Sequence, residues 1–552
     1  MAPSLARRLE PSFDALRRVA TNGGLLRLQL ASFLWSAAEA CYLVGLFVLA
    51  HVVGGTTAVA LVAVLRALPS VVLAPLALSL ADGLARDRLL RLVVLARLAC
   101  VGLATALVLA SGPLAALYAL AAVDAVAAAL LRPIRVTLVP ALARSPEELV
   151  AANVATSTGD SLAGLIGPGI AALLLVAGDV PATFVAGTLT MGVALASTLG
   201  VHAGGAIQTG GGPAAASRAR RASPVTAARD LFALRHARLI VALFAAQRFV
   251  RGMLTVLVVA AAFDVLGMGD AGVGVLTSAV GLGGLVGGAV ALSLVGRQRL
   301  AVAFLAGLVA WGGGILLAGV VPAVAVVVAF LAVAGIGKVV LDVAGFSLLQ
   351  RTVPTDRRGR VFGLLEGIVT AALAFGPVAA SLLVDGLGAP AALVVAGAIP
   401  IVLVAIAWPV LSSADDAAVV PERELRLLDS VAMFKPLQLT TIEQLAEGLR
   451  RQPVAAGSDV VRQGEAGDTF YIVESGRLEA LVDGRVTTQL GPGDSFGEIA
   501  LLRDVPRTAT VRALEPSLVM TLAREPFLAA VASHGESIAA ADEVVRTRLA
   551  GA

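Results

Sequence analysis

The sequence predicts a mainly α-helical, polytopic membrane protein: twelve transmembrane helices in two six-helix pseudo-repeats, then a C-terminal soluble β-roll with flanking helices. Three observations lead to this prediction. Of the 552 residues, 58% are hydrophobic and 14% are charged, whereas soluble domains contain about a quarter charged residues. Apolar runs of about 20 residues, long enough to span a bilayer core, recur between Leu25 and Val410. After Asp415 the composition becomes polar, and glycines punctuate short alternating runs.

The apolar runs give the positions of the spans. We expect them at residues 27–51, 57–80, 89–110, 114–131, 150–177, 182–201, 238–262, 272–295, 300–320, 323–346, 362–384 and 391–411. Several of these runs contain proline or glycine. Both are tolerated in a bundle, because neighbouring helices satisfy the backbone groups that such residues free.

The loop charges predict the orientation in the membrane. Arginines cluster in the loops after even-numbered spans, such as Arg86 and Arg88 after span two. The loops after odd-numbered spans, for example around Gly54 and Asp385, contain no Lys or Arg. By the positive-inside rule, we expect a multi-pass protein of the cytoplasmic membrane with both termini in the cytosol. Residues 1–22 lack a signal-peptide pattern and are expected to form a cytosolic segment.

The membrane part repeats itself. The segment Gly167–Leu174 resembles Gly376–Leu383, and Arg86–Leu89 resembles Arg297–Leu300. Both pairs are about 210 residues apart, which predicts two halves related as parallel repeats. The expected domains are an N-terminal segment (1–22), a first six-helix bundle (23–203), a cytosolic linker (204–235), a second six-helix bundle (236–411), a second linker (412–426) and the soluble domain (427–552).

This architecture resembles the major facilitator superfamily over about residues 20–411. The loop motif of that family after the second helix, G-x-L-A-D-R-x-G-R-R, is similar to Leu78–Asp87 here. Asp82 and Arg86 are kept, so the resemblance implies a gating contact that latches the two halves. The Gly-Pro pair in span five and the segment Arg358–Val361 are similar to those of drug and siderophore exporters, including proton-coupled ones. Export of a small molecule is therefore the expected activity.

Ionisable residues inside the spans are the transport candidates, because a charge in lipid is costly unless it is paired or faces water. They are Glu39 in span one, Asp124 in span four, Arg251 in span seven, and Lys338 and Asp342 in span ten. The resemblance implies that these four spans line a central cavity. Two interpretations stay open for the first two carboxylates: one of them carries a proton, or both form permanent ion pairs. The residues expected to be structural are Arg66, Arg97, Arg248, Asp160 and Glu366.

A motif in the soluble domain indicates its ligand. Residues Phe496–Val511 resemble the phosphate-binding cassette of cyclic-nucleotide-binding domains. The resemblance implies that the ligand-binding residues are Gly497, Glu498, Ile499, Ala500, Arg507, Thr508 and Ala509. The guanidinium of Arg507 suits a cyclic phosphate, Glu498 suits the ribose 2′-hydroxyl, and Gly497 lets the backbone approach closely. Thr508 suits cGMP, but bacterial cAMP binders also carry Ser or Thr there, so cAMP is favoured.

The combined interpretation is a secondary active exporter in the lipid bilayer, coupled to protons, that cytosolic cAMP or cGMP regulates. The last helix, which contains Val545, is expected to close over the nucleotide. The alternative is a membrane-tethered cyclic-nucleotide receptor that no longer transports. We expect neither an enzyme, since no nucleophile–base pair or metal-ligand cluster is visible, nor a channel, since nothing resembles a filter loop. The arginines lie in short loops and indicate topology, not nucleic-acid binding, and no cofactor is implied.

Overall fold

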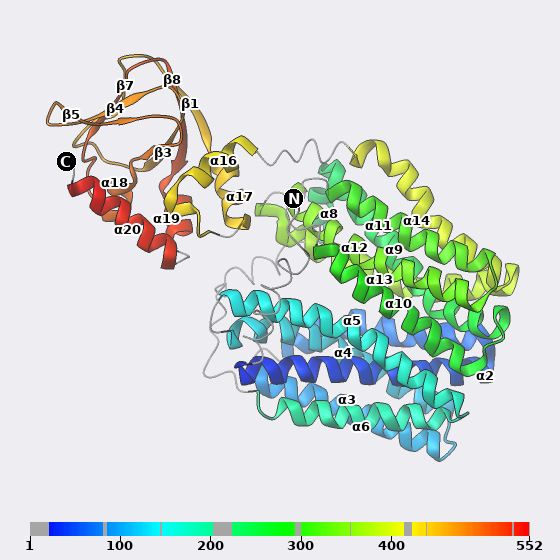
Figure 1. Cartoon of the computed structure of the whole chain (residues 1–552). Helices are drawn as coiled ribbons and strands as arrows, with labels where there is room; N and C mark the ends of the chain where they lie inside the picture. Colours follow the sequence, from blue (N-terminus) through cyan, green and yellow to red (C-terminus); the bar gives the residue numbers. More distant parts are fainter. Residues whose placement is uncertain are drawn as a thin grey trace. The chain divides into compact units, whose positions relative to one another are not determined.

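The computed structural model describes residues 21–80, 85–143, 146–201, 224–292, 300–353, 355–412, 422–437, 439–532 and 535–550. The chain forms two compact units, Met1–Asp416 and Ala417–Ala552. The first consists of helices, and the second combines strands with helices (Figure 1). The predicted fold class, a helical membrane part followed by a β-roll, is confirmed.

The helices of the first unit follow the predicted spans. They are α2 (Gly23–Leu80), α3 (Arg86–Leu109), α4 (Leu114–Leu142), α5 (Pro146–Val176), α6 (Val180–Thr198), α8 (Pro224–Ala233), α9 (Arg235–Ala260), α10 (Gly269–Leu292), α11 (Leu300–Val320), α12 (Val324–Thr352), α13 (Thr355–Leu387) and α14 (Ala389–Leu411), with a π-helical turn, η2 (Ala261–Val265), after α9. Helix α2 contains two predicted spans and breaks between them at Gly54 and Gly55. Gly55 has a φ of 62°, which glycine adopts without steric cost.

Within the described residues, ten helices are long and apolar enough to cross a membrane. The number is lower than the twelve expected because α2 counts once and α9 is not among the ten. Helix α9 carries Arg248 and Arg251 between its apolar turns. The short helix α8 lies within residues 204–235, where we expect only a linker; it packs against α9 and α13 and buries Ala227 and Leu231.

The first unit has two halves, α2 to α6 and α9 to α14. In the first half α2 packs against α4, α5 and α6; in the second half α11 packs against α12 and α14 (Figure 1). The halves meet where α5 lies along α10 and where α2 lies along α13. Small residues permit this approach, since a Cβ on Gly281 of α10 would lie 2.3 Å from the carbonyl oxygen of Gly164 of α5.

Side-chain contacts join the halves at the end of the bundle where α2 breaks. The hydroxyl of Thr56 lies 3.3 Å from Oδ1 of Asp385, across the boundary between the halves. The rings of His51 and Phe263 also meet across it, with centroids 4.4 Å apart. This end carries the loops without Lys or Arg, so the charge pattern predicts that it faces away from the cytosol.

The second unit is built on two antiparallel sheets of four strands each. The strands are β1 (Arg450–Val454), β2 (Asp459–Val461), β3 (Thr469–Ser475), β4 (Leu478–Val482), β5 (Arg485–Leu490), β6 (Ser495–Phe496), β7 (Thr510–Ala513) and β8 (Ser517–Ala523). Their orders are β1-β8-β3-β6 and β2-β7-β4-β5, so β3 and β4 belong to different sheets although they are adjacent in sequence. The flanking helices are α16 (Glu422–Ser430), η3 (Ala432–Phe434), α17 (Leu439–Gly448), α18 (Glu498–Arg503), α19 (Arg524–Ala532) and α20 (Gly535–Ala550).

Aromatic rings fill the core between a sheet and the helices of this unit. Phe434, Phe470 and Phe527 are fully buried, and their ring centroids lie between 4.7 and 6.0 Å apart. Helix α16 begins inside residues 412–426, where we expect a linker. Its Glu424 pairs with Arg451 of β1 at 3.1 Å, so the helix is part of the second unit.

Candidate functional site

The nucleotide cassette begins at a tight turn after β6. Gly497 has a φ of 91°, in the left-handed region that favours glycine. A Cβ at this position would lie 2.6 Å from Nη1 of Arg507 and 3.0 Å from the carbonyl oxygen of Thr469. The backbone conformation and the approach of the arginine thus both require glycine. Helix α18 follows directly, with Glu498 and Ala500 buried.

Arg507 is fixed by hydrogen bonds to main-chain carbonyls. Nη1 donates to the oxygen of Gly497 at 3.0 Å, and Nη2 donates to the oxygen of Thr469 at 2.8 Å. The guanidinium carbon lies 5.6 Å from the centroid of the Tyr471 ring, which stacks on Phe496. Nε is buried without a hydrogen-bond partner among the described residues. The oriented guanidinium therefore has one unsatisfied donor, of the kind that an anion satisfies.

Glu498 is fully buried and only half satisfied. Oε1 accepts a hydrogen bond from Nη1 of Arg548 at 2.7 Å, while Oε2 has no partner in the described part of the chain. Because an unpaired buried carboxylate oxygen is costly, Oε2 marks a position for a donor. The sequence pattern did not point to Arg548, although a cation in the last turn of a helix with apolar residues is a usable signal.

Gly467 lies against the guanidinium of Arg507 and, having no side chain, leaves space beside it. It lies in the turn before β3, and a Cβ there would be 2.7 Å from Nε of Arg507 and 2.8 Å from the Cβ of Ala500. A side chain at this position would therefore fill the space next to the unsatisfied donor. The sequence indicates Gly467 only as a turn residue, because its neighbours in the fold are distant along the chain.

The other three predicted ligand residues are less buried than Glu498, Ala500 and Arg507. Ile499 and Ala509 are half-buried, and Thr508 is exposed. In helix α20, expected to close over the nucleotide, Val545 is fully buried and Ile538 is 44% exposed. The residues that the structure brings together are Gly467, Gly497, Glu498, Ala500, Arg507 and, through its ion pair, Arg548.

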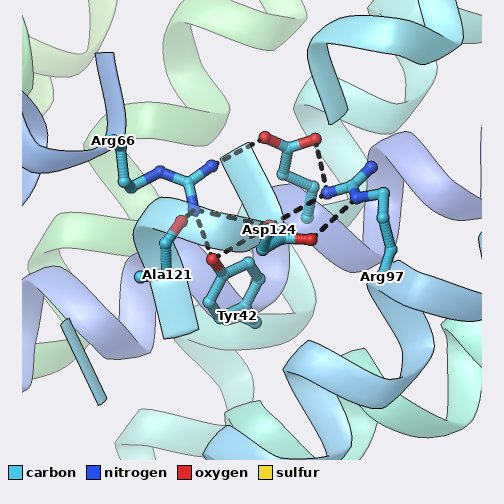
Figure 2. Close-up of polar contacts among 6 residues, drawn as sticks. Tyr42, Arg66, Arg97, Ala121 and Asp124 are labelled. Carbon is cyan, nitrogen blue, oxygen red and sulfur yellow. Dashed lines mark hydrogen bonds and ion pairs between the residues drawn. The ribbon is translucent and has the colours of Figure 1, made fainter. Parts of the chain in front are cut away.

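A closed ring of charges lies inside the first helical half (Figure 2). Arg97 of α3 donates through Nε to Oδ1 of Asp124 at 2.8 Å and through Nη2 to Oε2 of Glu39 at 2.9 Å. Arg66 of α2 donates through Nη2 to Oε1 of Glu39 at 2.9 Å, and its Nη1 lies 3.4 Å from Oδ2 of Asp124. Each carboxylate is thus shared by two guanidiniums, and the formal charges of the ring cancel.

Tyr42 adds a hydroxyl to this ring. It donates to Oδ2 of Asp124 at 3.1 Å and also contacts Arg66. The side chains of Arg97 and Asp124 are 1% and 2% exposed, whereas that of Glu39 is 28% exposed. Asp124 is therefore sealed inside the ring, and Glu39 is its most accessible carboxylate. The sequence predicts the two carboxylates but not Tyr42, since a neutral hydroxyl leaves no charge signal in an apolar span.

The second helical half holds an unbalanced group of charges. Asp342 of α12 lies 3.3 Å from Nζ of Lys338 and 3.6 Å from Nη2 of Arg248. The first of these pairs has the spacing of one helical turn that the sequence predicts. Arg251 of α9 is exposed and makes no hydrogen bond or ion pair with any described residue. Arg251 therefore lies beside Arg248 on α9 without an ion pair of its own to a described residue.

The predicted gating pair is described only in part. Asp82 lies outside the described residues, and Arg86 is the half-buried first residue of α3. Within the described ranges, no group of three or more His, Cys, Asp or Glu side chains is arranged to hold a metal ion.

Two protein-family models match the chain. The model of the Cyclic nucleotide-binding domain matches residues 451–534, and that of the Major Facilitator Superfamily matches residues 240–460. The second match covers the second helical half and runs beyond Asp416, where the first unit ends. The helices make this chain a multi-pass membrane protein; residues 240–460 are similar to the Major Facilitator Superfamily and residues 451–534 to the Cyclic nucleotide-binding domain, in agreement with the resemblances found in the sequence.

Individual relatives match shorter parts of the chain. The uncharacterized protein Rv0104 of Mycobacterium tuberculosis (strain ATCC 25618 / H37Rv) is 46% identical over 127 residues, 22% of this chain and 25% of that protein. The cAMP-dependent protein kinase regulatory subunit of Debaryomyces hansenii is 41% identical over 101 residues, 18% of this chain and 22% of that protein. Both matches thus span about a quarter of the relative's length or less. The co-crystal structure of the regulatory domain of Toxoplasma gondii PKA with cAMP is 34% identical, covering 20% of this chain and 43% of that chain, with a TM-score of 0.19.

Proposed function

We propose that the chain is a secondary active transporter regulated by a cytosolic cyclic nucleotide, with cAMP as the favoured ligand. The observation that carries the proposal is a pair of unsatisfied buried atoms, Nε of Arg507 and Oε2 of Glu498, in a cassette that follows a transporter domain. A phosphate anion satisfies the first atom, and a hydroxyl donor satisfies the second. A cyclic nucleotide carries both groups on one small molecule.

In the proposed complex, Arg507 holds the cyclic phosphate through Nε, beside Ala500 and the small Gly467. The ribose 2′-hydroxyl donates to Glu498, whose other oxygen stays paired with Arg548. The remaining pocket residues are those that the family resemblance implies, Gly497, Ile499, Thr508 and Ala509. The preference for cAMP over cGMP draws on a matching relative that is named a cAMP-dependent kinase subunit.

For the membrane unit we propose alternating access to a central site between the two halves. The contact between Thr56 and Asp385 closes one end, and the Asp82–Arg86 motif latches the other. Export of a small molecule from the cytosol is coupled to a proton on Glu39, because this carboxylate is 28% exposed and Asp124 is sealed. Both termini lie in the cytosol, and the membrane is the cytoplasmic membrane.

Regulation requires that the nucleotide affect the two transporter states differently. A ligand shifts an equilibrium only by the difference between its affinities for the two states. A coupling free energy of about 1–3 kcal/mol, typical of allosteric proteins, corresponds to a change of about 5- to 150-fold in an equilibrium constant. The nucleotide-binding unit therefore has to interact differently with the inward-open and outward-open states.

The test uses the full chain in proteoliposomes. cAMP, cGMP and 2′-deoxy-cAMP are titrated by calorimetry, and transport is measured with and without cAMP. We expect micromolar cAMP binding, weaker binding of the 2′-deoxy analogue, and a transport rate that cAMP changes. Arg507→Ala is expected to abolish both binding and the cAMP effect, and deletion of residues 414–552 is expected to change transport without abolishing it. Transport that is identical with and without bound cAMP would contradict the proposal.

A second candidate function is a membrane-tethered cyclic-nucleotide receptor without transport. The closed ring of Glu39, Asp124, Arg66 and Arg97 favours it, because charges that are fully paired fasten helices together and need no proton. Glu39→Gln separates the two functions. A transporter coupled through this carboxylate loses proton-driven export, while a receptor keeps its cAMP response unchanged.

A further inference from the structure

The charges of α9 and α12 do not balance. Asp342 is the carboxylate placed between Lys338 and Arg248, at 3.3 and 3.6 Å. Arg251, three residues after Arg248 and thus on a neighbouring position of the same helical face, makes no hydrogen bond or ion pair with a described residue. The two ion pairs of Asp342 and the three-residue spacing of Arg248 and Arg251 on α9 place these four groups in one cluster.

A fourth cation comes from the other helical half. Arg132 of α4 is exposed, makes no hydrogen bond or ion pair with a described residue, and lies close enough to Arg251 for their charges to interact. Arg132 and Arg251 thus come from different helical halves. Among the described residues this cluster therefore has four cations, Arg132, Arg248, Arg251 and Lys338, against the carboxylate of Asp342.

In the ring of the first half, the charges compensate one another without a ligand. There, two arginines and two carboxylates satisfy one another, with N–O distances between 2.8 and 3.4 Å. The second cluster lacks such compensation, and uncompensated cations within membrane-spanning helices are costly unless water or an anion neutralises them. Gln247, four residues before Arg251, adds a fully buried amide with neither atom bonded within the described residues.

We infer that the substrate of the central site is an anionic small molecule bearing a carboxylate or phosphate group, held between Arg251 and Arg132. This inference rests on the proposed transport function and names its substrate class. Guanidinium groups suit such anions because their planar donors match two oxygens at once. Asp342 acts as the internal counter-ion of Arg248 and Lys338 and competes with the bound anion for these cations.

The experiment measures binding to the full chain in lipid-free detergent, in an Arg507→Ala background so that the nucleotide pocket cannot take the anion. Thermal unfolding is followed with citrate, benzoate and inorganic phosphate, and with glucose and choline as neutral and cationic comparisons. A further sample contains phosphatidylglycerol. We expect a soluble anion to raise the unfolding midpoint, and glucose and choline to leave it unchanged. Because binding is measured and not transport, failure of this inference is distinct from failure of the proposed function.

Three variants make the test specific. Arg251→Gln is expected to weaken anion binding about tenfold or more, the loss of one charge-assisted hydrogen bond. Arg27→Gln, an exposed arginine of α2 that bonds the Gly200 carbonyl, is the matched control and should bind as before. Asp342→Asn should bind anions more tightly, a gain that misfolding cannot produce. Stabilisation by choline, glucose or phosphatidylglycerol alone, no shift with any soluble anion, or equal binding in Arg251→Gln and Arg27→Gln would overturn the inference.

Discussion

Nη1 of Arg548, in the last turn of α20, lies 2.7 Å from Oε1 of Glu498, the first residue of α18. The carboxylate is fully buried, and the arginine side chain is 35% exposed. One ion pair thus connects the C-terminal helix of the second unit to the cassette, 50 residues earlier in the chain. Oε2 of the same carboxylate has no hydrogen-bond partner among the described residues.

Loss of this ion pair is expected to cost both stability and affinity. Arg548→Met leaves Oε1 of Glu498 buried without a donor, which should lower the free energy of unfolding by about 1–2 kcal/mol and weaken cAMP binding several-fold. Denaturant unfolding and calorimetry of the 417–552 unit measure these two effects. Arg546→Met, which removes an exposed pair with Glu543, is the control and should change stability by less than about 0.5 kcal/mol. Equal effects of the two substitutions would count against the role of Arg548.

Arg507→Lys should not behave as a conservative change. The arginine bonds two carbonyls through Nη1 and Nη2 and still presents Nε, whereas an ammonium group cannot reach three positions from one fixed geometry. We expect cAMP affinity to fall about tenfold or more. Arg503→Lys, in an exposed pair with Asp542, serves as the control. If the Arg507→Lys protein bound cAMP within threefold of the parent, the geometric argument would be wrong.

Gly467→Ala is expected to reduce affinity by filling the space beside the phosphate-binding donor. The new Cβ would lie 2.7 Å from Nε of Arg507, so the guanidinium has to move. Gly484→Ala is a matched control, because that glycine has a φ of 78° and open space around it. The control should lose stability by about 1–2 kcal/mol through backbone strain and keep its affinity. The opposite ranking of the two affinities would refute this account of Gly467.

A double-mutant cycle tests whether the ion pairs of the charged ring permanently hold α2, α3 and α4 together. Arg97→Leu leaves the sealed carboxylate of Asp124 without its closest cation, which should cost about 3–5 kcal/mol. The double variant Arg97→Leu/Asp124→Leu removes both charges and should be more stable than Arg97→Leu alone. Thermal unfolding of the full chain in detergent measures this difference. Additive losses would indicate that the two residues act independently.

The second unit should show a pH-dependent contribution from Asp459. Hydrogen bonds from Arg512 at 2.7 Å and Arg462 at 3.1 Å hold the pKa of this carboxyl below its ordinary value. Because the folded-state pKa is lowered, the stabilisation is present above the unfolded-state pKa and is lost as the pH falls through the folded-state pKa. Asp459→Asn should therefore be less stable than the parent at neutral pH, and the difference should shrink as the pH falls below the ordinary pKa of an aspartate and vanish below the lowered folded-state pKa. A difference that persists at low pH would contradict this assignment.

Much of the fold can be predicted from the sequence because its signals are local. The length of an apolar run fixes a membrane helix, and the boundaries of α11 and α14 agree with the predicted spans within two residues. The cassette is a continuous stretch, so Gly497, Glu498 and Arg507 can be found from the resemblance of this one segment to the motif of a known family. Helices α8 and α16 were missed inside predicted linkers, because a short polar helix is stabilised mainly by the elements on which it packs.

What the sequence by itself determined is the order of the spans, the change to a soluble domain and the types of residue available for binding. The tertiary structure decided which charges are satisfied and which are not. Arg66 and Arg97 close a neutral ring only because α2, α3 and α4 pack together, whereas Arg251 forms no ion pair with a described carboxylate. Likewise Gly467 and Arg548 join the cassette only through the roll. Hydrogen bonds and ion pairs act over a few ångströms in space, and a linear sequence does not record that distance.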